Sequence, residues 1–446
     1  MNQTYMKEEK VFPLIVKMSL PMVVSMLVNS MYNIVDSFFV AKISENAMTA
    51  LSLVFPVQNL INAVMIGFGI GVNAAIAYFL GAKDTGAAGK SASQGMLYST
   101  FHGIVFTVLC IMGMPFFLRL FSANEEIVQL GIQYSDIAFL FSLVIAWQMV
   151  FEKTFQAVGR MTTTMICMMV GFVVNIVLDP VMIFGLCGFP RMGIRGAALA
   201  TGLGQTISLL FYIGFYIWAP ISVKYTWKDA KPDRQIAKRL YAVGIPGGLN
   251  LALPSLLISV LNVILGQFSQ SYVFVLGVYY KLQTFLYLPA NGVIQGMRPV
   301  IGYNYGAREY KRVHKIFRVS CLIVCGIMVV GTLLCLIFPE QLIGLFTEKA
   351  DTVEKGVKAL RILCMGFVVS SVSVTVTGAL EGLGRGISSL LISLLRYALC
   401  IIPCAFLLSR VLGAEGVWHA FWVTELLTSV FAYIYYKRLS ILWSKQ

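Results

Sequence analysis

The stretch Gly67-Phe-Gly-Ile-Gly-Val-Asn-Ala-Ala-Ile-Ala-Tyr-Phe-Leu-Gly-Ala-Lys83 is repeated in outline, 225 residues later, by Gly292-Val-Ile-Gln-Gly-Met-Arg-Pro-Val-Ile-Gly-Tyr-Asn-Tyr-Gly-Ala-Arg308. Both stretches are largely apolar and end in Gly-Ala followed by a basic residue. The same shift, without a gap, superimposes further pairs: Pro21 and Pro246, Gln58 and Gln283, Leu120-Phe-Ser122 and Leu345-Phe-Thr347, and Gly159-Arg160 and Gly384-Arg385. A shared register of this kind indicates an internal duplication.

The composition places the chain in a membrane. Of its 446 residues, 58% are hydrophobic and only 12% are charged, which is more apolar surface than a soluble core can hide. Apolar runs of twenty or more residues recur, long enough to cross a hydrocarbon layer about 30 Å thick as helices. The net charge of +14 could suggest nucleic acid, but the basic residues lie in short loops between apolar runs. We therefore predict an all-α integral membrane protein.

Turn residues and charges divide the chain into twelve predicted spans. These lie near 14–40, 47–80, 90–119, 125–150, 160–185 and 195–219, and then near 238–267, 272–299, 312–338, 352–379, 387–409 and 416–436. The long polar connection lies at the middle of the chain, so we expect an N-terminal six-helix lobe over 1–219, a cytoplasmic linker over 220–237 and a C-terminal six-helix lobe over 238–446. Since six crossings return the chain to its starting side, we expect the halves to be parallel repeats (6+6) with the same orientation.

Polar residues gather on the helices of the N-terminal half. Asp36 ends a stripe with Asn29 and Asn33, spaced so that all three share one helix face. The same one-turn spacing separates Asn175 from Asp179, Thr201 from Gln205, and Gln58 from Asn62. Two carboxylates with nearby amide and hydroxyl oxygens could bind a proton or a hard monovalent cation. The alternative is that these groups only join helices by hydrogen bonds.

The C-terminal half does not repeat this pattern. The 225-residue shift places Leu261 at the position of Asp36 and Cys404 at the position of Asp179. Lys281, Arg396 and Glu425 lie within its spans, where they could pair with one another or face a cavity. Our candidates for a substrate cavity are Asn29, Asn33, Gln58, Asn62, Gln205, Lys281 and Arg396. Pro21 removes a backbone hydrogen bond from the first span and predicts a hinge or a simple kink.

Three motifs resemble those of the multidrug and toxic compound extrusion (MATE) transporters. They are Tyr32-Asn-Ile-Val-Asp-Ser-Phe-Phe-Val40, Asn175-Ile-Val-Leu-Asp-Pro-Val-Met-Ile-Phe-Gly185 and Gly193-Ile-Arg-Gly-Ala-Ala-Leu-Ala-Thr201. The resemblance covers nearly the whole chain and implies that Asp36, Asn175, Asp179 and Thr201 form a cation-coupling site, with Pro21 as the bending proline. Some members carry a glutamate on span seven, where this chain has Asn250 and Asn262, so the DinF-like, N-terminal arrangement fits better.

The resemblance implies two six-helix lobes around a central cavity. It also implies an antiporter that exports amphipathic or cationic drugs by alternating access, driven by H⁺ or Na⁺. It implies no enzyme activity, no cofactor beyond the coupling ion, no metal beyond Na⁺, no nucleic acid and no obligate protein partner. The excess of Lys and Arg in the terminal segments and even-numbered loops predicts a multi-pass protein of the plasma (inner) membrane with both termini cytoplasmic. A lipid-linked precursor flippase is the alternative within transport, and an intramembrane enzyme or sensor is the alternative of another class.

Overall fold

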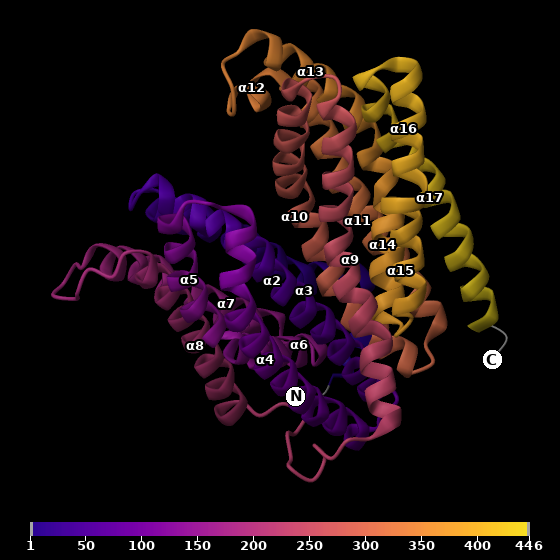
Figure 1. Cartoon of the computed structure of the whole chain (residues 1–446). Coiled ribbons are helices and arrows are strands. Elements are labelled where there is room, and N and C mark those ends of the chain that lie inside the picture. Colours follow the sequence, from indigo (N-terminus) through magenta and orange to yellow (C-terminus); the bar gives the residue numbers. More distant parts are fainter. Residues whose placement is uncertain (1–2, 444–446) are drawn as a thin grey trace. The chain divides into compact units, whose positions relative to one another are not determined.

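The computed structural model describes residues 3–443, and within this part of the chain the regular structure is helical throughout (Figure 1). The helices form two compact units. The first unit holds Val24–Gly248, and the second holds Thr4–Val23 and residues 249–443. All-helical architecture is what the composition and the apolar runs predicted.

Each unit is a bundle of long helices joined by short turns. The first unit contains α3 (Glu45–Gly81), α4 (Thr85–Phe121), α5 (Glu125–Leu140), α6 (Ser142–Ala157), α7 (Met161–Phe184) and α8 (Ile194–Trp218). The second contains α1 (Tyr5–Glu8), α10 (Gln270–Gly306), α11 (Tyr310–Ile337), α12 (Pro339–Gly344), α13 (Ala350–Leu363), η1 (Cys364–Gly366), α14 (Phe367–Gly382), α15 (Gly386–Leu394), η2 (Leu395–Cys400), α16 (Ile401–Leu412) and α17 (Ala414–Trp443). Two further helices, α2 (Val11–Ala41) and α9 (Arg234–Gly266), contribute to both units.

Ten helices, counted over the described residues, are long and apolar enough to cross a membrane. The pair α5 and α6, which covers the span expected near 125–150, adds an eleventh if it forms one span, and the two helices are bent by 43°. The remaining predicted span, 272–299, falls on α10, which has 37 residues and carries Lys281 and Arg298. The chain is thus a multi-pass membrane protein.

The turns confirm the duplication of the chain. Lys83 and Arg308 occupy the same position in the two copies of Gly-Ala-basic, and their φ angles are 62° and 59°. This left-handed conformation is uncommon for residues other than glycine, so its occurrence at both places is a shared structural feature of the repeats. In each copy the residue adopts it directly after a 37-residue helix, α3 or α10.

The two units differ from the expected lobes at the first and seventh spans. α2 passes from the second unit to the first after Val23, and α9 passes from the first to the second after Gly248, at positions 225 residues apart. Pro21 and Pro246 each lie two residues before the position at which their helix changes units. The connection between α8 and α9 packs on the first unit, where Gln94 Nε2 donates to the Lys231 carbonyl oxygen at 2.8 Å.

Repeated glycines allow these exchanged segments to pack closely. In the first unit, Gly67 and Gly71 of α3 face α9, and a methyl group on Gly71 would overlap the Leu240 carbonyl oxygen. In the second unit, Gly292 and Gly296 of α10 face α2 at Val23 and Ser19. The pairs Gly67–Gly71 and Gly292–Gly296 are equivalent in the repeat, and small residues four apart are a common means of close helix packing in membranes.

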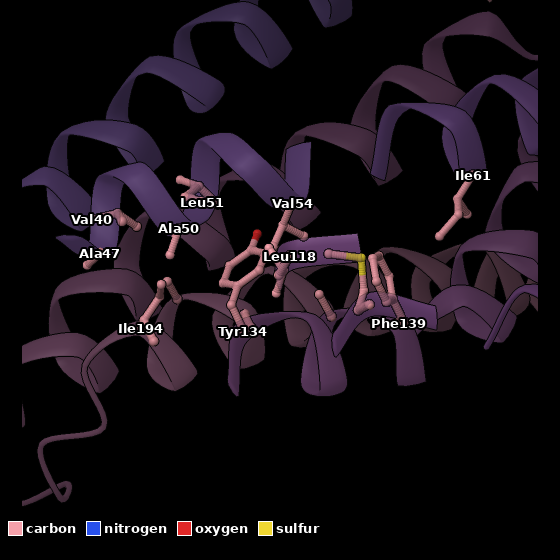
Figure 2. Packing of buried hydrophobic residues seen from close by; sticks show 14 of the residues in the cluster. Val40, Ala47, Ala50, Leu51, Val54, Ile61, Leu118, Tyr134, Phe139 and Ile194 are labelled. Atoms are coloured by element: carbon pink, nitrogen blue, oxygen red, sulfur yellow. The ribbon is translucent and has the colours of Figure 1, made fainter. Parts of the chain in front are cut away.

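A cluster of apolar side chains joins α3, α4, α5 and α8 of the first unit (Figure 2). Ala47, Ala50 and Val54 come from α3, and Phe139 and Tyr134 come from α5. All five are buried. This cluster fixes the helices that carry the polar residues described below.

We expect Gly71→Ala to destabilise the protein by about 1–3 kcal/mol, because the added methyl group meets backbone that cannot move aside as a side chain can. The matched control is Gly113→Ala on α4, where an added methyl group has no neighbour within 4 Å. Thermal unfolding of purified protein in detergent measures both. Equal midpoints for the two variants would show that close packing at Gly71 does not stabilise the first unit.

Candidate functional site

Two carboxyl groups meet inside the first unit. Asp36 lies in the second half of α2, and Asp179 lies near the end of α7. Their side chains are within hydrogen-bonding reach of each other. Asp179 is fully buried, and no hydrogen-bond donor among the described residues reaches either of its carboxyl oxygens or Asp36 Oδ1. Two acids in this arrangement repel each other when both are ionised, and a proton or another cation between them would remove the repulsion.

Amide and hydroxyl oxygens lie one helical turn away from this pair. Asn175, on the same face of α7 as Asp179, donates from Nδ2 to Thr201 Oγ1 on α8 at 3.2 Å. The other amide atom, Asn175 Oδ1, is buried and has no donor among the described residues. The structure therefore brings together all four residues that the family resemblance singles out: Asp36, Asn175, Asp179 and Thr201.

Two tyrosines complete the cluster, and the sequence analysis did not name either as a site residue. Tyr32, one turn before Asp36, stacks on Phe172 with ring centroids 5.3 Å apart, and its hydroxyl is within hydrogen-bonding reach of Thr201. The one-turn spacing from Asp36 could have indicated Tyr32. Tyr134 of α5 is held in the apolar cluster of Figure 2 and accepts a hydrogen bond from Gln58 Nε2 at 3.3 Å.

Two small cavities adjoin the cluster on either side of α8. One, of ≈ 30 Å³, is lined by residues that include Gln58, Asn62 and Thr201, and the other, also of ≈ 30 Å³, by residues that include Tyr32 and Asn175. Thr201 and Gln205 line both. Since about 10–15 Å³ suffices for one water molecule, each cavity has room for water or a small cation but not for a drug-sized molecule.

Other predicted cavity residues lie elsewhere. Asn29 and Asn33 are exposed, and Asn33 Nδ2 donates to the Asn29 carbonyl oxygen of its own helix at 2.7 Å. Tyr32, one turn before Asp36, is the residue of α2 that lies close to Asp36 and Thr201. The expectation that Asn29 and Asn33 line a substrate cavity stays a prediction. In the second unit, Lys281 is exposed with its amino group 5.8 Å from the Phe346 ring centroid, and Arg396 is paired with Glu425.

The fold and the cluster define an integral membrane transporter built from two copies of one helical repeat. The family model for MatE matches residues 21–181 and again 246–407, with starting points 225 residues apart. The chain therefore belongs to the MatE family, a family of transporters and not of enzymes.

Multidrug export proteins of two Staphylococcus species are similar to almost the full chain. The multidrug export protein MepA of Staphylococcus aureus is 27% identical over 433 residues, which cover 96% of this chain and 94% of that protein. MepA of Staphylococcus haemolyticus is 25% identical over 94% of this chain and 92% of its own length. The outward-facing structure of a multidrug resistance MATE family transporter superimposes with a TM-score of 0.93 at 25% identity, covering 100% of this chain and 99% of that one.

We predict that Asp36→Asn stabilises the protein at pH 9 in buffer without sodium. Two unit charges about 4 Å apart repel by about 4 kcal/mol at an effective dielectric constant of about 20, and the variant removes one of them. At pH 5, where a proton can bridge the wild-type pair, the gain in stability should shrink. Thermal unfolding at the two pH values measures the difference.

The control for this measurement is Asp351→Asn on α13, which removes an exposed carboxylate paired with Lys355 Nζ at 2.6 Å. This variant should gain no stability at pH 9, because it removes an attraction and no repulsion. If Asp36→Asn and Asp351→Asn behave alike, the Asp36 and Asp179 side chains do not repel each other as the geometry requires.

Proposed function

We propose that this protein is a cation-coupled exporter of amphipathic or cationic small molecules, in which Asp36 and Asp179 bind the coupling ion, H⁺ or Na⁺. The observation that carries the proposal is the pair of facing carboxyl groups without a donor. Asn175 Oδ1 and the Thr201 hydroxyl supply neutral oxygens beside them, as a hard cation requires. The name shared by the relatives, multidrug export protein, supports the substrate class.

Ion binding would act on the helices that supply the ligands. An ion held between Asp36 and Asp179 draws α2 toward α7, and α8 is tied to α7 through the bond from Asn175 to Thr201. In α2, Pro21 lies two residues before the point where the helix changes units. If the segment of α2 that carries Asp36 moves when the ion binds, the helix would bend near this proline. Pro21 is accordingly our candidate hinge between an ion-bound and an ion-free conformation.

The ion gradient is large enough to drive export. Each charge that crosses 100 mV yields about 2.3 kcal/mol, which sustains a concentration ratio of about fiftyfold if one charge is exchanged for one neutral substrate. Exchange with a monovalent organic cation would draw on the chemical gradient alone.

A flippase for lipid-linked precursors would need a cavity with more basic residues, for which Lys281 and Arg396 are the candidates. Arg396 is neutralised by Glu425, and Lys281 lies exposed beside Phe346. We therefore favour the exporter. In the orientation that we propose, the protein lies in the plasma membrane with both termini cytoplasmic, so the connection between α7 and α8 faces outward.

Asp36→Asn is expected to lower efflux of a fluorescent cation, driven by an imposed proton or sodium gradient, at least tenfold in proteoliposomes. The amide removes the charge that attracts the ion while it keeps the size of the side chain. Ser37→Ala, at the next position of α2, is the control and should transport as the wild type does. Unimpaired gradient-driven efflux by Asp36→Asn at equal protein levels would refute the coupling role.

The orientation can be tested with a native cysteine. Cys187 is exposed in the connection between α7 and α8, so a membrane-impermeant maleimide added to intact cells should label it. Trp227→Cys in a Cys187→Ser background, which places the thiol between α8 and α9, should be labelled only after permeabilisation. The reverse pattern would place both termini outside.

A further inference from the structure

The second unit holds an ion pair that stability alone does not explain. Arg396 Nε donates to Glu425 Oε1 at 2.7 Å, and Nη2 donates to the same oxygen. The two side chains are only 11% and 12% exposed, and Ser373 Oγ donates to Glu425 Oε2 at 3.5 Å. Apolar residues of similar volume would often stabilise such a place at least as well as a buried ion pair. An ionisable pair within membrane helices therefore calls for a functional explanation.

The repeat relates Glu425 to the cation cluster of the first unit. Gly193 before α8 and Gly413 before α17 both have positive φ, 56° and 63°, and three residues later each helix has a glycine pressed against a carbonyl of the preceding helix. When α8 and α17 are aligned by these glycines, Glu425 falls on Gln205. Since Gln205 lines both cavities beside the carboxylate pair, Glu425 occupies the corresponding place in the second unit.

Arg396 takes the position of a closely packed glycine of the first unit. The 225-residue shift aligns Arg396 with Gly171, where an added methyl group would lie 2.9 Å from the Gly204 carbonyl oxygen. The helix pair α7 and α8 therefore packs backbone against backbone at this level. In the second unit the guanidinium group of Arg396 stands between the corresponding helices.

Three tyrosines lie near the charges. The Arg396 guanidinium lies 5.1 Å from the Tyr397 ring centroid. Tyr280 and Tyr287 are close enough to interact electrostatically with both members of the ion pair. The Tyr287 hydroxyl is bonded to Ser370 Oγ at 2.7 Å, whereas the buried Tyr280 hydroxyl has no partner among the described residues. Aromatic faces attract organic cations, and a carboxylate beside them adds an opposite charge.

The backbone at Arg396 can change its register. Arg396 lies in η2, a π-helical segment of six residues between α15 and α16. A π turn holds one residue more than an α turn, and such segments are frequent at functional sites. If η2 converts to α-helix, the residues that precede it turn by about 100° about the helix axis relative to those that follow it. This is the angle per residue of an α-helix. This rotation would separate Arg396 from Glu425.

We propose that Glu425 and its tyrosines form a binding site for the charged head of a monovalent organic cation, and that Arg396 occupies this site as a tethered cation until the substrate replaces it. The inference rests on the proposed export function, to which it adds the residue that binds the positive charge of the substrate. Arg396 thereby keeps the carboxylate paired when no substrate is present.

Equilibrium binding of ethidium, a fluorescent monovalent cation, to purified protein in detergent tests this proposal without any ion gradient. Glu425→Gln should weaken binding by about tenfold or more, because a charge-assisted contact is lost. Arg396→Gln should tighten binding, because the competing tethered cation is gone. A structural ion pair predicts the opposite for Arg396→Gln, namely weakened binding together with a lower unfolding midpoint.

Lys437→Gln, an exposed position of α17, is the control for the loss of one positive charge and should bind as the wild type does. Arg396→Lys provides a second variant if Arg396→Gln does not fold. Its single ammonium holds Glu425 less firmly than the guanidinium, so ethidium should bind more tightly than to the wild type. Unchanged or weaker binding in both Arg396 variants would overturn the proposal.

The same measurements in the Asp36→Asn background separate this site from the ion-coupling function. The opposite effects of the Arg396 and Glu425 variants on ethidium binding should persist there even if gradient-driven efflux is lost. Their disappearance in that background would show that ethidium binding depends on the first unit and not on Glu425.

Discussion

Two acids that face each other in a buried place restrict what the first unit can do. Asp36 and Asp179 come from different helices, and no donor among the described residues reaches Asp36 Oδ1 or the Asp179 oxygens. With both charges present the pair repels, and with a cation between them it attracts. In the function that we propose, the packing of α2 against α7 depends on whether an ion is bound, as an ion-coupled transporter requires.

The two units share the helix packing of a duplicated repeat, but they differ in their buried polar residues. The equivalent glycine pairs Gly67–Gly71 and Gly292–Gly296 hold the exchanged segments of α9 and α2 in the two units. Where the first unit has closely packed glycines and a carboxylate pair, the second has Arg396 and Glu425. One unit thus presents two negative charges and the other a neutralised pair, which suits a division of work between ion and substrate.

The sequence predicted those features that depend on local composition. Apolar run length indicated membrane helices, and the 225-residue register indicated the repeat. The resemblance to the family motifs singled out the four residues Asp36, Asn175, Asp179 and Thr201. Tyr134 could not be predicted, because helical spacing shows which residues share a face but not which helix that face meets. The π-helical segment at Arg396 and the exchange of α2 and α9 depend on packing between distant parts of the chain, which has no local signal.

Infrared difference spectroscopy of the purified protein tests most directly whether Asp36 and Asp179 act as one ion-binding pair. Spectra are recorded while the pH or the sodium concentration is changed, and they report carboxyl and carboxylate stretching bands. The account predicts that one buried carboxyl group changes its band, and that this change disappears in both Asp36→Asn and Asp179→Asn because the ion belongs to the pair. A band change that survives in both variants would contradict the account.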